Sequence, residues 1–383
     1  MNRRHTPKRF PARHGVDSPE IGSSFEIVQD KYLVAGTSRP FPWVETSDMY
    51  YVESGRQALA LVEAELRAQG HSRIHVPSYL CDSMIHPFQS AGWTLTELPV
   101  DDDLVIRPAD LISRVTTGVL LHAPYFGRQD SPEMLDALAI LRRRGVVVVA
   151  DETHRVFSGP SSVADIRVAS LRKSLPLFDG AYVTGVSDRL SPGVQTAPSK
   201  AALLRERAMR VKTDALSSGA GNKAHLELFA RAERATEART QPAPMSADSL
   251  ALLHRLDLKL IGTTRRMNSI TLTRALGHSD RFRVINSPDE NLLPFYVVLE
   301  TVDAAGLQHY LVGHRIYCPI HWPPSELLTR TGTWPTCYLS LPIDHRYDEK
   351  DMLRMADCIN VYFALDAGNS APSSSCCLGL WIL

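Results

Sequence analysis

The stretch VVVVADETHRVF, residues 146–157, decides the fold of this chain. Its first half is a continuous apolar, β-branched run, which is typical of a strand that is covered on both faces. The run stops at Asp151, and a carboxylate is costly to bury unless a positive group meets it. His154 follows three residues later, close enough to face the same pocket. We therefore expect a buried parallel strand that ends at a polar site.

Helix-like and strand-like segments alternate around this strand, from residue 51 to about 185. Helices are expected after a cap at Ser54 and after Ser131, where a proline and an acidic first turn follow. The strands expected between them are 73–77, 93–100 and 117–123. This rhythm predicts an α/β fold with a mostly parallel sheet and helices on both sides. Ligands bind at the carboxyl ends of the strands in such sheets, so functional residues should follow strands.

The remainder of the chain changes in character twice. Residues 198–277 are expected to be largely helical, and from residue 281 the pattern fits a smaller α+β region. That region has expected strands at 291–300 and 315–320 and expected helices at 302–313 and 348–365. We predict a disordered basic extension over 1–20, a large domain over 21–280, a small domain over 281–366 and a flexible tail over 367–383.

Lys173 lies between the apolar strand IRVAS and the segment SLPLFDGAYV. The chain has eight lysines against 34 arginines, and the other lysines lie in tails, helices or polar loops. Lysine is the one basic side chain that can lose its proton when partly buried and then form an imine. Taken alone, Lys173 also fits a salt-bridged residue at a strand end, just as Asp151 alone fits a turn or a helix cap.

The segment SGRQAL, residues 54–59, is a small-residue turn that opens a helix. Free N–H groups and the positive end of a helix dipole make such a turn a seat for phosphate, although many helices begin with Ser-Gly. The order of the features is more specific: a phosphate seat, then Asp151 with a ring partner, then Lys173 22 residues later. Pyridoxal phosphate (PLP) requires this layout, with a phosphate anchor, a carboxylate at the pyridine nitrogen and a lysine at the aldehyde carbon.

With these segments in this order, the chain resembles the fold type I PLP-dependent enzymes, specifically the DegT/DnrJ/EryC1/StrS sugar aminotransferases. The resemblance extends from about residue 50 to 365. SGRQALALV is similar to the SGTxAL phosphate turn of that family, and DETHRVF to its D-x-A-[QH] motif. SLRKSLPLFDGAYV resembles its lysine segment, and LHAPYFGRQ its VHLYGQ segment. The implied fold is a large domain with a mostly parallel, seven-stranded sheet and a smaller C-terminal α+β domain.

The resemblance implies PLP as the cofactor and assigns three catalytic roles. Lys173 would carry the cofactor and move protons, Asp151 would lie at the pyridine nitrogen, and His154 on the O3′ side of the ring. The residues that the resemblance assigns to the cofactor are Gly55, Arg56, Gln57, Tyr79, Cys81, Asp151, His154, Ser170 and Lys173.

The sequence departs from the family pattern at several positions. The aromatic residue that stacks on the cofactor ring corresponds to Cys81, which leaves Cys81 itself or Tyr79 for that role. The phosphate serine corresponds to Val168, and Ser170 is the alternative. The segment that sends an asparagine to the phosphate of the partner subunit appears as QPAPMS, with Asn222 as a candidate replacement.

The substrate side of the predicted site is less specific. CPIHWP, residues 318–323, resembles the HYP-type strand of the family, so His321 and Trp322 are candidates to line the substrate site, and a packed aromatic pair is the alternative. Arg346 could reach the cleft, although a surface ion pair fits it better.

The implied activity is transfer of an amino group from an amino acid, with glutamate as the expected donor, to a keto group, with a nucleotide-linked sugar as a candidate acceptor. The resemblance also implies a homodimer with active sites at the subunit interface. Two alternatives stay open. One is dehydration, decarboxylation or C–C bond chemistry on the same fold, and the other is a PLP-fold protein that binds a ligand or partner without turnover.

The composition argues against several other classes of protein. The 42 basic and 42 acidic residues cancel, which gives no overall electrostatic case for nucleic acid or an anionic membrane. No apolar stretch reaches the length of about 18 residues that a membrane span needs. The six cysteines form neither a disulfide framework nor a zinc-binding CxxC pair, so we expect a reduced, cytoplasmic protein.

Overall fold

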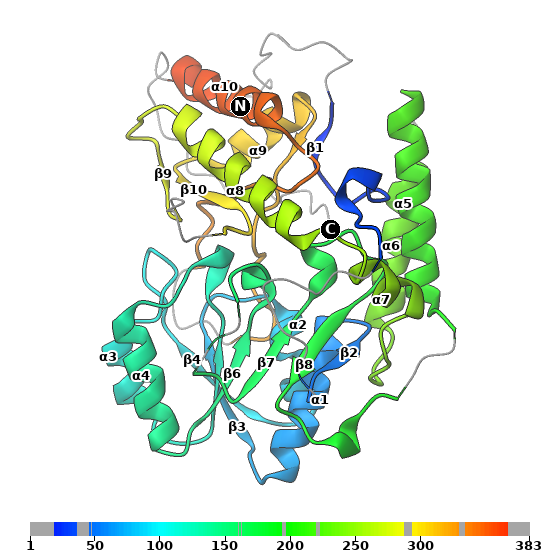
Figure 1. Ribbon diagram of the computed structural model, residues 1–383. Coiled ribbons are helices and arrows are strands. Elements are labelled where there is room, and N and C mark those ends of the chain that lie inside the picture. Colours follow the sequence, from blue (N-terminus) through cyan, green and yellow to red (C-terminus); the bar gives the residue numbers. More distant parts are fainter. Residues whose placement is uncertain are drawn as a thin grey trace, which may run out of the picture.

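A seven-stranded sheet forms the larger part of the molecule (Figure 1). The computed structural model describes residues 19–36, 46, 48–159, 161, 163–193, 197–219, 223–286, 293–328 and 334–366. In spatial order the strands are β2 (Tyr50–Val52), β8 (Ala181–Thr184), β7 (Ile166–Ala169), β6 (Val147–Asp151), β5 (Val119–His122), β3 (Arg73–Pro77) and β4 (Thr94–Leu98). From β7 to β4 neighbouring strands are parallel, and β8 is antiparallel to β7 and β2. The predicted mostly parallel sheet is confirmed.

Helices pack on both faces of this sheet, as the sequence predicts. The helices α1 (Gly55–Ala68) and α2 (Asp82–Ser90) share one apolar core with Val119, Leu121 and Val149. The helices α3 (Pro108–Arg114) and α4 (Pro132–Arg143) share another with Leu120 and Val148, whose side chains leave the strands on the opposite face. Both predicted caps form, since Ser54 accepts a hydrogen bond from the N–H of Gln57 and Ser131 one from that of Met134.

Four helices connect the large sheet to the rest of the chain. They are α5 (Lys200–Ser218), α6 (Ala224–Glu237), α7 (Ala247–Leu253) and α8 (Leu258–Ala275). The breaks after α5 and after α6 fall at the Gly-rich and Pro-rich stretches that the sequence shows at 217–223 and 241–246. The helices α5 and α6 pack against each other and extend along one side of the molecule (Figure 1).

A smaller antiparallel sheet completes the fold, with β10 (Val297–Thr301) between β12 (Tyr338–Leu341) and β9 (Phe282–Val284). The helices α9 (Ala304–Gly313) and α10 (Glu349–Asp366) accompany it. A separate pair joins β1 (Ile21–Gly22) to β11 (Ile316–Tyr317). The core of this part also takes in Ile21 and Leu272, which lie inside the range 21–280 expected for the large domain. Residues 1–18 of the extension expected over 1–20, and the whole tail expected over 367–383, lie outside the described residues.

Two strands of the smaller part are shorter than the sequence pattern indicates. The strand expected at 291–300 is observed from Val297, after Pro294, and the one expected at 315–320 ends at Tyr317, ahead of Pro319. Proline has no N–H to donate to a strand ladder, which explains both boundaries.

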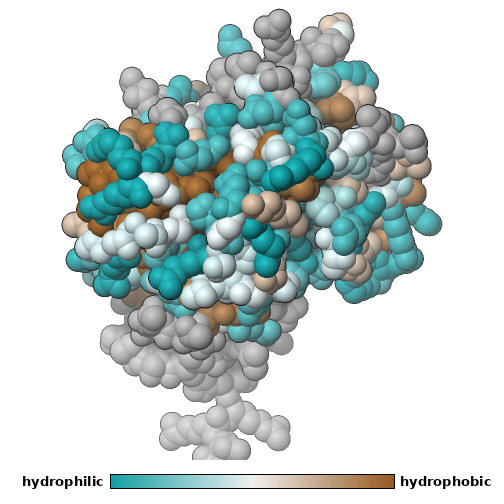
Figure 2. All heavy atoms as spheres, turned by 90° about the horizontal axis from the view of Figure 1, so that it is seen from below, coloured by the Kyte–Doolittle hydropathy of each residue, from teal (hydrophilic) through white to brown (hydrophobic). Residues whose placement is uncertain are grey.

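The carboxyl ends of the parallel strands face the smaller sheet, which lies at the top of Figure 1. Figure 2 views the molecule from the opposite end, where hydrophilic residues are interspersed with hydrophobic ones. A hollow of about 370 Å³ at the amino ends of β6 and β7 is lined by Arg142, Asp165 and Gly185 among others, and by no residue expected to bind the cofactor. In the part of the chain that the structure describes, no helix is long and apolar enough to cross a membrane.

Candidate active site

Asp151 ends β6 at the edge that faces the smaller sheet. Burial raises the pKa of its carboxyl, and the hydroxyl and N–H of Thr153 and then the charge of Lys173 oppose this rise. The N–H of Thr153 donates to Oδ1 of Asp151 at 3.0 Å. Among the described residues no ion pair within 4.0 Å compensates this carboxylate. Its position therefore favours a proton or a cationic ligand beside it.

Thr153 links this carboxylate to the next strand. Its Oγ1 accepts a hydrogen bond of 3.0 Å from the N–H of Ser170, the residue that follows β7. The 3₁₀ turn η3 (Thr153–Arg155) thus joins the ends of β6 and β7. No motif in the sequence marks Thr153, although a residue two positions after an aspartate at a strand end is a common partner for that carboxylate.

The beginning of α1 lies directly against Ser170. A Cβ placed on Gly55 would lie 3.1 Å from Cβ and 3.6 Å from Oγ of Ser170, so only glycine leaves this space open. The first N–H groups of α1 have no partner within the helix and face the same region. The helix end, Gly55 and the Ser170 hydroxyl form a cradle that fits a phosphate.

The two residues after Gly55 differ in their surroundings. The side chain of Gln57 is buried, donates to Glu53 at 3.2 Å and accepts from the N–H of Ala243 at 3.0 Å. That side chain is therefore engaged in the fold, and the backbone N–H of Gln57 already donates to Oγ of Ser54. Arg56 is partly exposed and makes no hydrogen bond or ion pair with another described residue.

Lys173 is exposed in the 3₁₀ turn η4 (Leu171–Lys173), which follows β7. Its charge opposes the rise in the pKa of Asp151 and lowers the pKa values of His154 and His321. One side chain thus acts electrostatically on all three groups, which come from two separate segments, the end of β6 with η3 and the segment after β11. The turn is held by Arg172, whose guanidinium pairs with Glu233 of α6 through two bonds of 3.0 Å.

His154 is buried in η3 within a stack of rings. Its ring lies parallel to those of Phe295 and Trp322, at centroid distances of 4.5 and 5.6 Å. Its Nδ1 lies 3.1 Å from the N–H of Phe126. Burial, followed by the charges of His321 and Lys173, holds its pKa well below the usual range. A neutral imidazole therefore faces the site at physiological pH.

His321 and Trp322 follow β11 and lie beside His154. Nδ1 of His321 is 2.8 Å from Oγ of Ser340, and burial together with the charge of Lys173 lowers its pKa to about 3. Trp322 is partly exposed, and its carbonyl accepts the indole N–H of Trp334 at 3.0 Å. Both residues flank the predicted site, and their contact with a substrate stays a prediction.

The two candidates for the face of the cofactor ring are not equivalent in the structure. Tyr79 is 1% exposed, and its ring is packed among Tyr125, Trp322 and Trp334. Cys81 is partly exposed, and it acts together with Asp151 on the pKa of Tyr125, which burial raises well above its usual value. Cys81 is thus the more exposed of the two, and which of them contacts the cofactor ring stays a prediction.

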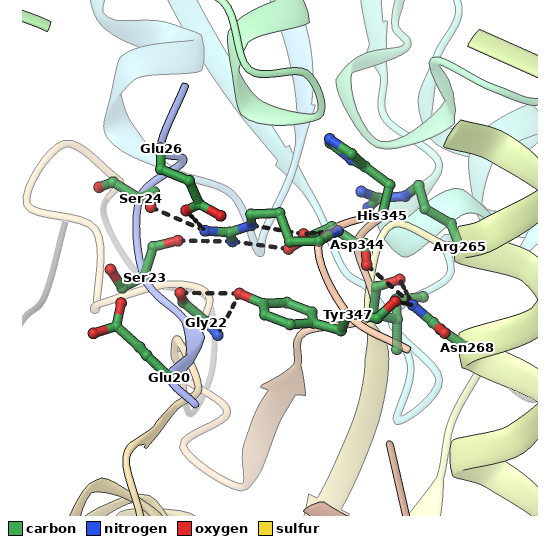
Figure 3. A network of polar contacts seen from close by, with 12 residues as sticks. Glu20, Gly22, Ser23, Ser24, Glu26, Arg265, Asn268, Asp344, His345 and Tyr347 are labelled. Atoms are coloured by element: carbon green, nitrogen blue, oxygen red, sulfur yellow. Dashed lines mark hydrogen bonds and ion pairs between the residues drawn. The ribbon is translucent and has the colours of Figure 1, made fainter. Parts of the chain in front are cut away.

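Arg346 is neither at the cleft nor in a surface ion pair, which corrects both expectations. Its side chain is 8% exposed and pairs with Asp344 at 2.7 Å and with Glu26 at 3.1 Å. Figure 3 shows the N-terminal segment around Glu26 pointing at the loop that carries Asp344. The partners come from segments far apart in the sequence, which a local pattern does not reveal. Glu20, Glu26, Lys212, Asp344 and Arg346 are called the Arg346 cluster below.

The residues described above fit PLP. The cradle at Gly55 and Ser170 suits its phosphate, and the partly unpaired Asp151 suits a protonated pyridine nitrogen. The neutral His154 and the lysine on η4 lie on the same side of the sheet edge. Asn222, the candidate for a contact with a partner subunit, lies outside the described residues.

Comparison with protein-family models and with curated proteins finds no match for this chain. Solved structures do match. The sugar aminotransferase CalS13 from Micromonospora echinospora is 14% identical, with a TM-score of 0.57 over 82% of this chain and 87% of that one. Spr1654 from Streptococcus pneumoniae in its PLP form is 14% identical, with a TM-score of 0.62 over 90% and 98%.

A DegT/DnrJ/EryC1/StrS aminotransferase from Brucella abortus is 16% identical, with a TM-score of 0.54 over 82% of this chain and 85% of that one. Identities this low show the fold alone. The structure and these neighbours agree with the architecture expected from the sequence, since the large mixed sheet and the smaller C-terminal sheet occur together. This chain therefore has the fold type I architecture of the DegT/DnrJ/EryC1/StrS sugar aminotransferases.

Proposed function

We propose that this chain is a PLP-dependent aminotransferase that moves an amino group from an amino acid to a keto group. The observation that supports this most is the series of contacts from Gly55 through Ser170 and Thr153 to Asp151. It sets a phosphate cradle and a buried carboxylate on one sheet edge, beside the lysine whose charge reaches Asp151. No metal or nucleotide-binding motif is needed to account for these residues.

PLP, when bound, supplies a ring that draws electrons away from the carbon next to the amino nitrogen. The cradle of Gly55 and Ser170 would bind its phosphate and fix its orientation. Asp151 would hold a proton at the ring nitrogen, and the raised pKa of its carboxyl indicates a site that favours sharing one. Lys173 would hold the cofactor covalently and move a proton at its Nζ.

The aromatic rings around His154 shield its imidazole from water. Phe295 and Trp322 cover the imidazole on its faces and keep water from it. Because this histidine stays neutral, it can donate one N–H to the oxygen on the cofactor ring without adding a positive charge. The site thereby holds the ring in place and leaves Lys173 as the group that exchanges protons.

We infer glutamate as the donor and a keto group on a nucleotide-linked sugar as the acceptor. This rests on the resemblance and on neighbours such as CalS13, which is described as a sugar aminotransferase. We also infer a homodimer in the cytoplasm. The apolar side chains Leu203, Leu216 and Leu226 are exposed on α5 and α6, and the four cysteines in the described part are free thiols. Light scattering of the purified protein tests the dimer.

The test of the function is a PLP titration of the purified protein, followed in the visible region. The wild type should develop the visible band of covalently held PLP, and Lys173→Ala should not. Lys200→Ala is the matched control, because Lys200 is exposed at the start of α5 and should leave the band unchanged.

Adding glutamate then tests the reaction class. Aminotransfer predicts that the visible band is lost, that 2-oxoglutarate appears in equal amount, and that a keto acceptor restores the band. Loss of ammonia or carbon dioxide from an amino acid would instead favour the dehydratase or decarboxylase alternatives. A protein that never develops the band would contradict the proposal.

A further inference from the structure

We propose that Asp130 is a positioning residue that fixes the tautomer and orientation of His154. Asp130 follows the loop after β5, and neither the sequence motifs nor the comparisons assign it a role. The structural part of the inference stands on the protein alone, and its consequence for the cofactor rests on the proposed function.

The tautomer of His154 follows from one hydrogen bond. A backbone N–H can only donate, so the N–H of Phe126, 3.1 Å from Nδ1, requires that nitrogen to accept. The imidazole is buried and neutral, so its single proton must lie on Nε2. His154 therefore presents an N–H at Nε2, the nitrogen free to serve the site.

The N–H of Phe126 is aimed by an unusual backbone. Phe126 has a φ of 56° and a ψ of 24°, in the left-handed region that a bulky residue rarely adopts. Its carbonyl is held by the N–H of Phe295 at 3.1 Å and by the amide of Asn286 at 3.3 Å. A Cβ on the next residue, Gly127, would lie 2.7 Å from the carbonyl oxygen of Leu293, so this position requires glycine.

Asp130 ties this loop to the turn that carries His154. Its side chain is 6% exposed, with Oδ1 2.7 Å from Nε2 of His122 and Oδ2 3.2 Å from Nη1 of Arg155. Although burial raises the pKa of Asp130, His122 and Arg155 lower it below the usual value. His122 ends β5 and Arg155 is the neighbour of His154, so one carboxylate joins the strand, the loop and the turn.

The loop and the turn are therefore joined by two contacts, which fall on adjacent residues of the turn. Phe126 contacts His154, and Asp130 contacts Arg155. Among the described residues, the titratable groups that act on the pKa of His154 are His321 and Lys173, so Asp130 acts on His154 only through these two links. Without the ion pair, the Phe126 N–H is no longer held in line with Nδ1, and the Nδ1–H tautomer becomes accessible.

The first test is a measurement on the protein without PLP. Nitrogen NMR of protein labelled at histidine, with His154→Gln to assign the signal, should show Nδ1 of His154 unprotonated and Nε2 protonated. Asp130→Asn keeps the shape of the side chain and should yield a second signal from the Nδ1–H tautomer. Asp165→Asn is the matched control, because it removes a carboxylate paired with Arg142 at the far end of the sheet.

The second test uses the holoenzyme. A donor on the ring oxygen competes with the cofactor's own proton for that oxygen, so weakening it should raise the pH midpoint of the visible band. We expect a rise of about half to one pH unit in Asp130→Asn, the size that loss of one hydrogen bond produces, with PLP content unchanged. Should Asp130→Asn fail to fold, Arg155→Gln removes the same tie and should act in the same direction.

The outcomes separate the two proposals. A wild type without the visible band counts against the proposed function, while the NMR result still decides the role of Asp130. A wild type with the band, combined with an unchanged tautomer and an unchanged midpoint in both variants, would overturn the inference.

Discussion

Asp151 and His154, the buried ionisable groups at the end of β6 that belong to the candidate site, have few partners in the protein, whereas the groups of the Arg346 cluster have several. Asp151 accepts one backbone hydrogen bond and has no ion pair among the described residues. Arg346, by contrast, reaches two carboxylates and the carbonyls of Ser23 and Ser24 (Figure 3). Lys212, 2% exposed, pairs with Glu20 at 2.9 Å.

The pKa values diverge accordingly. Burial raises the pKa of Asp151 and lowers that of His154, so both are pushed toward their neutral forms. In the Arg346 cluster the same burial is outweighed, since Arg346 holds the pKa of Asp344 below its usual range and Asp344 raises that of Arg346. Burial of ionisable groups alone therefore does not mark a ligand-binding site. Buried ionisable groups that lack partners in the protein do mark one, because they can still bind a ligand.

The largest expected effect is on catalysis and comes from Asp151→Asn. Loss of the carboxylate should reduce aminotransfer by roughly 10²–10⁴-fold, the range typical of a positioned acid or base. The pKa of Asp151 is raised in the folded state, so its contribution to stability falls as pH rises above the unfolded value of about 3.9. The variant without PLP should therefore unfold at a higher denaturant concentration at pH 7. A destabilised variant would contradict the contrast drawn above.

Arg346→Met should reduce stability and leave PLP binding unchanged, the opposite of what we expect for Asp151→Asn. It leaves Asp344 buried without its paired cation and leaves Glu26 with Lys212 alone, 3.5 Å away, which should lower the free energy of unfolding by about 3–5 kcal/mol. Denaturant unfolding measures this, and PLP content of the folded fraction should not change. Arg142→Met removes an exposed pair with Asp165 and should change stability by at most about 1 kcal/mol. Equal losses in the two variants would count against a special role for the cluster.

Glu233→Gln sharpens the comparison through pH. Burial raises the pKa of Glu233, but the charges of Arg172 and Arg205 lower it to about 2. A depressed carboxyl stabilises the fold above its unfolded pKa of about 4.3, and that stability is lost as pH falls toward the folded value. The variant should therefore lose on the order of 2–3 kcal/mol at pH 7 and match the wild type near pH 2. Parallel stability curves would show that the pair contributes nothing.

Gly55→Ala is the smallest change. The added methyl lies 3.1 Å from Cβ of Ser170, so it should crowd the cradle and weaken PLP binding about tenfold. Unfolding without PLP should move little, because φ of Gly55 is not in the left-handed region. Titration of the visible band gives the affinity for PLP. Unchanged binding would contradict the assignment of the phosphate to this cradle.

Local patterns sufficed for the large sheet and its helices. The caps at Ser54 and Ser131 and the strand at 73–77 depend on neighbours within a few residues, and all three are observed. The two-residue strand at Ile21 lacks such a pattern, because its partner is almost 300 residues away. It forms a separate pair with β11, and Ile21 shares the apolar core of the smaller part of the molecule.

Only part of the candidate site could be predicted from the sequence. Asp151 ends a strand, His154 and Lys173 lie in the turns after strands, and all three match a motif, so they could be named in advance. Thr153, Phe126 and Asp130 act through contacts between different segments, and no motif marks them. The burial of Arg346 was missed for the same reason, because apart from Asp344 its partners come from the first residues described.

The most direct test of the account is to identify the lysine that carries PLP. The protein would be loaded with PLP, reduced with borohydride to fix the linkage, digested and sequenced by mass spectrometry. The account predicts the cofactor on the peptide that contains Lys173, with one site per chain. Labelling of exposed lysines such as Lys200, or of none, would contradict it.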